Sequence, residues 1–377
     1  MAESPNMQLL PRLVLIREQH PLFARFWRSA SPFWLTQKAW GLAIFLVAIV
    51  LVQLLVQVLL NLWNRNFFNA LERKDGDALW FQAELFVPLA AASILLAAAS
   101  VWGRMTAQRN WRELTTRHVI EKWLEHDRFR RLNHHLIKGS ENPEYRIVVD
   151  IRVATDAPID LSLAFFCSII TSITFFVVLW TIGGSITVAP FGWPVTIPGY
   201  LVFGVIVYSS LVSMLMVMFG QHMTGVIERM NQSDAEFRAA ADAFRGENEN
   251  AGGKTGDGER RQTLQLKLQA TLLWWRELLW QLVRTTFVSQ GNVLFAPVVG
   301  WFLCVPKYLT GAMTLGELTQ AAAAFVVVQS AFNWMVDNYQ RLADWRSAVH
   351  RVATLLMALD ELEAKERANT NHRNAAS

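Results

Sequence analysis

The stretch AWGLAIFLVAIVLVQLLVQVLL, residues 39–60, decides the fold because it runs for 22 residues without a charged side chain. At about 1.5 Å of rise per residue, a helix of this length crosses a hydrocarbon core about 30 Å thick. Gln53 and Gln57 are four residues apart and therefore share one helical face. The stretch predicts a membrane-spanning helix that meets lipid on most sides and a polar environment on one.

Composition agrees with a membrane protein. Of the 377 residues, 53% are hydrophobic and only 18% are charged, whereas soluble domains carry about 25% charged residues. Cys167 and Cys304 lie in apolar runs, so we expect buried thiols rather than a disulfide. The N-terminal apolar stretch is broken by Arg12 and Arg17 and does not resemble a secretory signal, so the first span is expected to act as an uncleaved insertion signal.

Six uncharged segments of 18 to 22 residues are long enough to span a bilayer. They are Ala39–Leu60, Leu85–Trp102, Leu161–Ile182, Tyr200–Gly220, Thr285–Val305 and Leu318–Val336. The predicted fold class is an all-α membrane protein with six transmembrane helices and two long cytoplasmic helical hairpins.

The positive charges predict the orientation of the spans. The N-terminal segment, the connections 103–160 and 221–284, and the C-terminal tail together hold 31 of the 35 lysines and arginines. By the positive-inside rule, these four regions and both termini are cytoplasmic. The net charge of +4 is therefore a topology signal, and no nucleic-acid partner is expected.

The expected domains are a cytoplasmic segment over 1–38, a transmembrane domain over 39–338 and a cytoplasmic helix and tail over 339–377, without a nucleotide-binding domain. The connections 103–160 and 221–284 are rich in helix formers and are expected to form hairpins. The second span is expected to continue as helix to about Leu136. A glycine-rich turn is expected over Gly246–Gly258, and the last dozen residues are expected to lack structure.

Polar side chains inside the spans are the candidate functional residues, because such groups are costly in hydrocarbon and face other helices or water. The predicted transport pathway comprises Gln53, Gln57, Asn61, Gln290, Asn292, Gln329, Asn333 and Asp337. Each residue alone fits an interhelical hydrogen bond better. These residues form three polar stripes: Gln53, Gln57 and Asn61 on the first span, Gln290 and Asn292 on the fifth, and Gln329, Asn333 and Asp337, spaced by four, on the sixth. Taken together, the three stripes favour a hydrophilic passage.

No enzyme chemistry is predicted. The segment GGKTG at Gly252–Gly256 resembles a phosphate-binding loop, but the glycine needed five residues before Gly253 is replaced by Asn248 and a polar helix precedes it. His134 and His135 are adjacent and point apart on a helix, which does not indicate a metal site. We expect no catalytic residue, cofactor or metal.

Five stretches carry a resemblance to the SbmA/BacA-like transporters and to the transmembrane half of bacterial and peroxisomal-type ABC transporters of the exporter plan. They are NRNFFNALERKD (64–75), NPEYRIVVDIR (142–152), GGSITVAPFGWPVTIPGYL (183–201), GAMTLGELTQ (311–320) and AFNWMVDNYQRLADWRSAVHR (331–351). The resemblance runs from about Phe26 to Leu359.

The resemblance implies a homodimer in the bacterial inner membrane that imports peptides, peptide antibiotics or other bulky polar solutes. In ABC members the segment that begins at Asn142 would be the coupling helix that docks onto an ATPase, here with Asn142, Pro143, Glu144, Arg146 and Asp150. In the SbmA/BacA type, proton motive force drives transport instead. No Walker motif is found in these residues, and Met7–Thr36, which arginine and proline interrupt, is not expected to form the additional N-terminal span of the SbmA/BacA type.

The leading hypothesis is a homodimeric inner-membrane transporter of peptides or other bulky hydrophilic solutes, working by alternating access and driven by proton motive force. The alternative is the permease subunit of an ABC transporter with a separately encoded ATPase. A third class is a membrane scaffold whose cytoplasmic hairpins bind a partner. The sequence names neither the solute nor the carboxylate that would carry protons.

Overall fold

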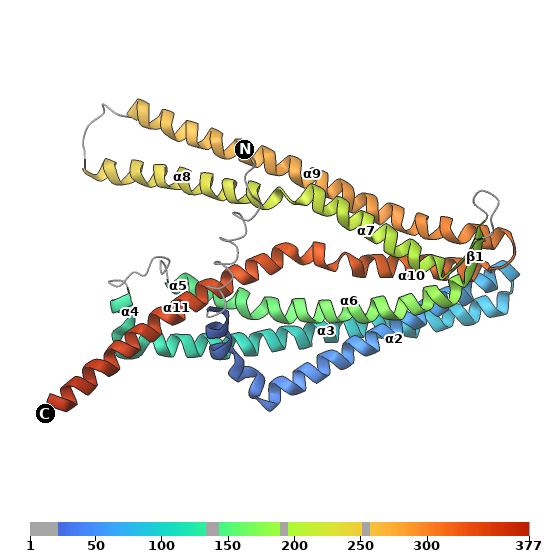
Figure 1. Cartoon of the computed structure of the whole chain (residues 1–377), viewed down its shortest axis with the longest axis horizontal. Coiled ribbons are helices and arrows are strands. Elements are labelled where there is room, and N and C mark those ends of the chain that lie inside the picture. Colours follow the sequence, from blue (N-terminus) through green and yellow to red (C-terminus); the bar gives the residue numbers. More distant parts are fainter. Residues whose placement is uncertain (1–21, 133–142, 189–194, 251–256, 377) are drawn as a thin grey trace, which may run out of the picture. The chain divides into compact units, whose positions relative to one another are not determined.

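Long helices make up most of the computed structural model, which describes residues 22–132, 143–188, 195–250 and 257–376 (Figure 1). Six helices in this described part are long and apolar enough to cross a membrane, which confirms the all-α, six-span prediction. The residues Asn142, His134, His135 and Gly252–Gly256 lie outside the described part.

The chain divides into two compact units. Unit 1 contains the residues up to Thr171 together with those from Asp337 onward, and unit 2 contains Ser172–Val336. Two helices, α6 (Ile151–Gly183) and the start of α11 (Trp334–Ala376), run across the division.

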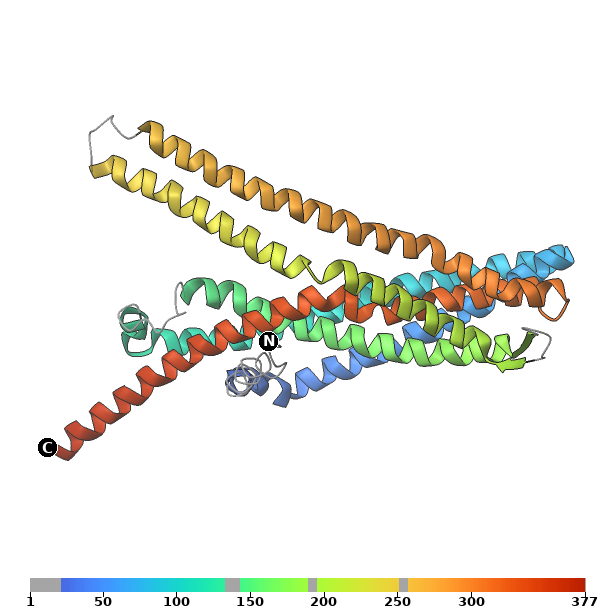
Figure 2. The ribbon, with the colours of Figure 1, turned by 45° about the horizontal axis from the view of Figure 1, so that its top comes forward.

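Unit 1 contains the first pair of spans, α2 (Gln37–Arg73) and α3 (Gly76–Leu124), which lie side by side (Figures 1 and 2). Lys74 has a left-handed backbone with φ of 54°, and the Asp75 carboxylate accepts a 3.1 Å hydrogen bond from Ala78 N, so the chain reverses in two residues. A Cβ on Gly103 would lie 2.9 Å from a methyl carbon of Leu46. The glycine therefore permits close packing of the two helices.

The predicted continuation of the second span as helix to Leu136 is wrong. Helix α3 ends at Leu124, and a 3-10 turn, η3 (Glu125–Asp127), separates it from α4 (Arg128–Leu132). His126 has φ of 52°, outside helical geometry. The buried Arg128 guanidinium donates to Lys122 O at 3.2 Å, which satisfies a carbonyl that the helix end leaves free.

The third span begins further upstream than its apolar stretch. Helix α5 (Pro143–Tyr145), a π-helical turn η4 (Arg146–Asp150) and α6 follow one another without interruption. Pro143 is the first residue of α5, where its missing N–H costs nothing. The segment from Pro143 to Asp150 is therefore continuous with the helix of the third span.

A β-hairpin in unit 2, which the sequence analysis did not predict, connects α6 to α7 (Tyr200–Gly220). Strands β1 (Ser185–Val188) and β2 (Val195–Pro198) pair antiparallel, with Ser185 opposite Pro198 and Val188 opposite Val195. Val, Ile and Thr make up most of both strands, and such β-branched residues favour strand geometry. Gly199 closes the hairpin with φ of 61°, and a Cβ there would lie 2.3 Å from the Trp180 ring.

The remaining helices of unit 2 are α8 (Met223–Asn250), α9 (Asp257–Leu309) and α10 (Leu315–Phe332). Helices α8 and α9 lie side by side along their lengths in both views (Figures 1 and 2), and Ser233 and Thr271 share a buried 3.0 Å hydrogen bond. The expected turn over Gly246–Gly258 is shorter than predicted, because helix continues to Asn250 and resumes at Asp257.

The core of unit 1 gathers around α11. Buried apolar residues of α11, from Ala348 to Leu362, pack with Trp111 and Val119 of α3, Ile151 of α6 and Phe26 of the helix over residues 22–30. A short 3-10 helix, η2 (Ser31–Leu35), follows that helix. The expectation that the last dozen residues lack structure is wrong, since α11 is helical to Ala376 and Glu366 forms ion pairs with Arg128 and Arg131.

Close packing of α9 on α10 gives a first testable prediction. A Cβ on Gly300 would lie 3.1 Å from Ala322 Cα, which is backbone and cannot move aside. The Gly300→Ala variant should therefore lose about 1–3 kcal/mol of stability, measured by thermal unfolding in detergent. Gly291→Ala is the matched control on the same helix, because a Cβ added at Gly291 would have no neighbouring atom within 4 Å. Equal stability of the two variants would contradict the packing.

Candidate functional site

The turn that leads into the third span is held against α11 by a buried ion pair. The Asp150 carboxylate is 1% exposed, and both of its oxygens accept from Arg351, at 2.7 Å from Nη2 and 2.9 Å from Nε. This is the two-point geometry that a guanidinium and a carboxylate favour. The hydrogen bonds from Arg351 to Asp150 also raise the pKa of Arg351. Arg146, also buried, donates to the backbone oxygen of Arg351 at 3.2 Å.

This arrangement divides the predicted coupling residues into two groups. Pro143, Arg146 and Asp150 are buried within unit 1. Glu144 is exposed, as are Tyr145 and Val148, each 59% exposed. A partner that docked on this turn would therefore meet Glu144, Tyr145 and Val148. Asn142 lies outside the described residues.

A second set of contacts fixes α11 along α6 and α3. Asp160 of α6 forms an ion pair with Arg341 at 2.6 Å and accepts from Gln108 of α3 at 2.7 Å. The Trp345 indole donates to Ala154 O at 3.3 Å. Pro158 has no N–H to offer that carbonyl four residues earlier, so the indole supplies the missing donor.

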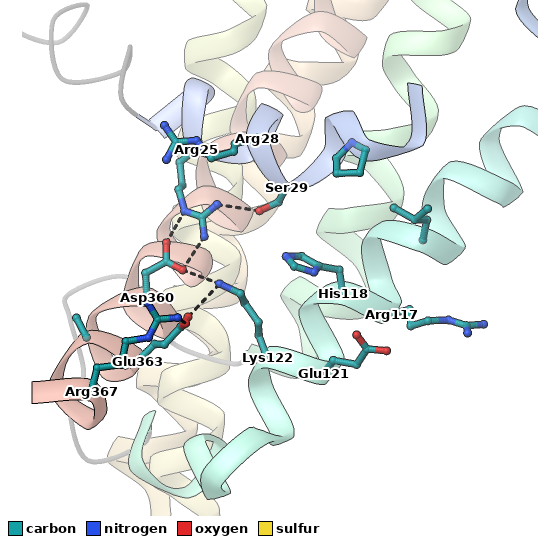
Figure 3. Close-up of a pocket in the computed structure, with 13 residues that line it drawn as sticks. Arg25, Arg28, Ser29, Arg117, His118, Glu121, Lys122, Asp360, Glu363 and Arg367 are labelled. Carbon is teal, nitrogen blue, oxygen red and sulfur yellow. Dashed lines mark hydrogen bonds and ion pairs between the residues drawn. The ribbon is translucent and has the colours of Figure 1, made fainter. Parts of the chain in front are cut away.

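The far part of α11 carries a cluster of ion pairs with α3 and the helix over residues 22–30, which Figure 3 shows. Asp360 bonds to Arg25 and to Lys122, and Lys122 also bonds to Glu363 at 3.2 Å. Burial alone would raise the pKa of Asp360, but the hydrogen bonds from Arg25 and Lys122 lower it overall. The cluster borders a cavity of about 900 Å³.

His118 lies beside this cluster, between Ser29 and Lys122 in Figure 3. Its pKa is lowered by partial burial and by the positive charges of Lys122 and Arg25. Glu121 on the same helix and Asp360 on α11 oppose that effect only in part. Folding therefore disfavours the protonated imidazole.

The predicted pathway residues of unit 1 lie on α2 and at the start of α11. Gln53 and Gln57 are half-buried, and Asn61 is buried. Asp337 is exposed. Helix α10 ends at Phe332 and α11 begins at Trp334, but Asn333 between them has a right-handed backbone (φ −72°, ψ −10°), and its N–H donates to Gln329 O at 3.2 Å. The predicted stripe of Gln329, Asn333 and Asp337 therefore crosses a one-residue turn between the two helices.

The predicted pathway residues of unit 2 lie on α9 and α10. Asn292 accepts a 3.1 Å hydrogen bond from the Tyr208 hydroxyl and so joins α9 to α7, whereas Gln290 is exposed. Gln329 is 3% exposed and Asn333 is 9% exposed. Within the described part of the chain, Gln329 Nε2 and Asn333 Oδ1 are buried without a hydrogen-bond partner. These two amides are the strongest candidates for polar groups that face a passage.

Sequence reasoning missed the role of α11 as the element that organises unit 1. The available signal was the run of Asp360, Glu363 and Glu366, which recur every three residues on one helical face. Their basic partners lie more than 200 residues earlier in the sequence. The spacing identifies an acidic stripe on α11, but the basic residues that pair with it can be identified only from the structure.

The Asp150–Arg351 pair predicts an asymmetric response to mutation. Arg351→Ala leaves the carboxylate buried and unpaired and should cost about 3 kcal/mol. Asp150→Asn leaves an arginine whose side chain is 45% exposed and should cost about 1 kcal/mol. Unfolding in denaturant measures both. Arg117→Ala removes an exposed pair with Glu113 and should change stability by less than about 0.5 kcal/mol. A smaller loss in Arg351→Ala than in Asp150→Asn would contradict the burial argument.

The lowered pKa of His118 predicts a pH dependence of stability. His118 binds a proton at its ordinary pKa of 6.5 in the unfolded chain but only at lower pH in the folded chain. The stability that neutral His118 contributes to the fold is therefore fully present above pH 6.5 and is lost as the pH falls below that value. His118→Gln should reduce the loss of thermal stability between about pH 7.5 and about pH 5.5. His350→Gln, which replaces an exposed histidine of α11, should retain the parent's pH dependence. Identical pH profiles for His118→Gln and the parent would refute the assignment.

Comparison with known proteins identifies relatives that are longer than this chain. It is 25% identical to the inner membrane ABC transporter ATP-binding protein YddA of Escherichia coli, over 93% of this chain and 63% of the relative. It is 25% identical to an ABC transporter ATP-binding protein of Synechocystis, over 88% of this chain and 49% of the relative. It is 22% identical to the chloroplastic ABC transporter D family member 2 of Arabidopsis thaliana, over 91% and 47%. The chain thus spans about half to five-eighths of the length of these relatives.

The family comparison matches most of the described helices. The model for ABC transporter transmembrane region 2 matches residues 32–309, from the short helix before the first span to the end of α9. The six candidate spans fit a multi-pass membrane protein, and the chain belongs to the ABC transporter transmembrane region 2 family.

Proposed function

We propose that this chain forms the translocation pathway of a bacterial inner-membrane transporter for peptides or other bulky hydrophilic solutes. The observation that carries the proposal is the pair of buried amides, Gln329 and Asn333, whose Nε2 and Oδ1 atoms have no partner within the described residues. An unpaired polar group is costly in a low-dielectric interior. The two amides are therefore expected to face water, solute or a second protomer during transport.

The division of the chain supports an alternating-access mechanism. Two compact units are connected through α6, after Thr171, and through the first turn of α11, after Val336, which follows the one-residue turn at Asn333. A helix break at such a connection is a place where backbone angles change at low cost during a hinge motion. Asn333 would then combine two roles, one as a polar group of the passage and one as part of the hinge.

A homodimer is proposed because one chain contains six spans, whereas a wide hydrophilic passage needs walls on all sides. The amide residues of α2 belong to unit 1, and those of α9 and α10 belong to unit 2. Two copies of the chain would supply both sets of amide residues twice, enough to surround a passage. The resemblance to SbmA/BacA-like transporters implies the same assembly. The mass of the purified complex in a lipid nanodisc tests it.

ATP hydrolysis is the energy source favoured by the family and by the turn at Pro143–Asp150. The related proteins of Escherichia coli and Synechocystis carry "ATP-binding" in their names. The exposed Glu144, Tyr145 and Val148 lie on a turn that the Asp150–Arg351 pair holds rigidly, which suits the transmission of motion from a docked ATPase. Proton motive force, implied by the SbmA/BacA resemblance, is the second candidate.

Transport of a labelled peptide into proteoliposomes distinguishes these candidates. The protein would be reconstituted with any subunit that copurifies, and uptake would be measured with ATP alone and with an imposed pH gradient alone. Uptake that needs ATP and is blocked by vanadate supports the ATPase, and uptake abolished by an ionophore but insensitive to vanadate supports protons. No accumulation of any solute under either condition would reject transport in favour of a membrane scaffold.

The pathway assignment predicts the behaviour of three variants of neighbouring residues. Gln329→Ala and Asn333→Ala should each lower peptide uptake about tenfold or more, because they remove polar groups from the passage without changing a charge. Ser330→Ala is the control, since this hydroxyl belongs to an exposed residue and donates to Val327 O of its own helix. Membrane insertion and folding would be checked by size-exclusion chromatography. Unchanged uptake in both amide variants would remove them from the passage.

A further inference from the structure

A recess in unit 2 lies where α7 gives way to α8, against the facing part of α9. Its volume is about 980 Å³, within the range of small-molecule sites. The side chains that matter for its chemistry are those of Arg229, Trp274, Arg276, Glu277 and Arg284. Both α7 and α9 belong to unit 2, so the recess is formed within one compact unit.

The recess has a fixed polar floor. Helix α7 ends at Gly220 and α8 begins at Met223, so the intervening turn leaves helical carbonyls without their usual donors. Gln281 of α9 is 3% exposed, and its side-chain amide donates to Phe219 O. The break between the two helices is thereby joined to α9.

The recess carries an excess of uncompensated positive charge. Arg229, Arg276 and Arg284 face a single carboxylate, that of Glu277. In the described part of the chain, none of these three arginines forms an ion pair. Arg229 lies over the Trp274 ring at 5.2 Å, a cation–π contact that holds its guanidinium at the recess. Cations placed together without carboxylate partners favour an anionic ligand.

The position of Arg284 along α9 places the recess at the edge of the membrane. Between Arg284 and Lys307 the sequence has no charged residue, and at about 1.5 Å per residue this segment is about 35 Å long, enough to cross the hydrocarbon core. Arg284 therefore lies at one headgroup level. Trp274, Trp275 and Trp280 lie close to it in sequence, as expected for aromatic residues at a membrane interface.

An apolar groove begins on the adjacent residues of α9 and runs into the span. Its volume is about 670 Å³, and it is lined from Trp275 to Phe295 almost entirely by apolar side chains. Leu279, Phe287 and Leu294 within it are 53%, 82% and 70% exposed. The part of the groove beyond Arg284, from Phe287 to Phe295, is about 12 Å long by helical rise, so part of an acyl chain can lie along it. The recess and the groove share no lining residue, but both include parts of α9, and the groove continues past Arg284 into the span. A charged recess followed by an apolar surface along the same helix is complementary to an amphiphile.

We propose that this recess and groove bind one anionic phospholipid, with the headgroup phosphate at Arg229, Arg276 and Arg284 and an acyl chain along the α9 groove. The chemistry follows from charge-assisted hydrogen bonds between guanidinium and phosphate, together with burial of the chain against apolar side chains. Such basic sites at the ends of spans bind anionic headgroups. The site requires neither the proposed solute nor the proposed energy source.

Native mass spectrometry of the delipidated, purified protein tests the site directly. The protein would be titrated in separate arms with dioleoylphosphatidylglycerol, dioleoylphosphatidylcholine and inorganic phosphate. One molecule of phosphatidylglycerol should bind at least about tenfold more tightly than phosphatidylcholine. Equal binding of the two lipids would overturn the proposal. Displacement of the anionic lipid by millimolar inorganic phosphate would identify a soluble-anion site instead and would also overturn it.

Variants separate the headgroup site from the groove. The double variant Arg276→Gln/Arg284→Gln should weaken phosphatidylglycerol binding by at least about tenfold, because each arginine contributes a charged hydrogen bond. Arg238→Gln removes an exposed charge of α8 outside the recess and should leave the affinity unchanged. Gly291→Phe should weaken binding by filling the groove, in which Gly291 has open space.

Unchanged affinity in both the double arginine variant and Gly291→Phe would refute the site. The unfolding temperature of each variant without lipid serves as the folding check, since the substituted side chains are exposed or border open space. The binding assay needs no transport, so a failed uptake experiment and a failed lipid experiment are independent results.

Discussion

The constraint on which this structure depends is that a peptide group buried in hydrocarbon or in the packed protein has no water to bond and needs a hydrogen-bond partner within the chain. Within a continuous helix, the backbone N–H and C=O groups bond to one another. At the helix ends, the last carbonyls have no partner in the helix and need another donor. Three ends in the described chain are closed by a side chain that donates to a terminal carbonyl: Arg128 to Lys122 O, Gln281 to Phe219 O and Lys307 to Gly183 O. The same rule explains the contact of Trp345 with the carbonyl that Pro158 leaves free. Arg128 is six residues from its acceptor, whereas Gln281, Lys307 and Trp345 come from distant parts of the sequence to satisfy the carbonyls at these positions.

The spans could be predicted from the sequence because their signal is local. Absence of charge over about 20 residues is enough to identify a span. Five of the six predicted segments each lie within one helix, and the sixth, Leu318–Val336, runs across the one-residue turn between α10 and α11. The breaks could not be predicted in this way. His126 occupies a left-handed backbone conformation without being glycine, and this geometry is stabilised by the pairing of Arg128 with Glu366 of α11. A contact that spans more than 200 residues leaves no periodic pattern in the sequence.

The candidate site shows the same division between local and distant information. Four-residue spacing places Gln329 and Asn333 together at the end of α10, but it does not reveal the one-residue turn at Asn333 between α10 and α11. Charged residues in the segment after Asn142 were interpreted as a docking surface. The structure turns Arg146 and Asp150 inward to α11 and leaves Glu144 exposed. Sequence identifies which side chains are polar, and packing decides which way they face.

The positive-inside rule counts all lysines and arginines in the same way, but the structure separates those that form ion pairs within the fold from those that do not. In unit 1, Lys122, Arg128 and Arg351 are each bonded to a carboxylate of the fold, so their charge is satisfied internally and serves to hold α11 in place. In unit 2, Arg276 and Arg284 lie at the edge of a span with no ion-pair partner in the described part of the chain. A cation whose field is not cancelled by its own fold attracts anions from outside it. The first group accounts for rigidity, and the second accounts for attraction to a charged membrane surface.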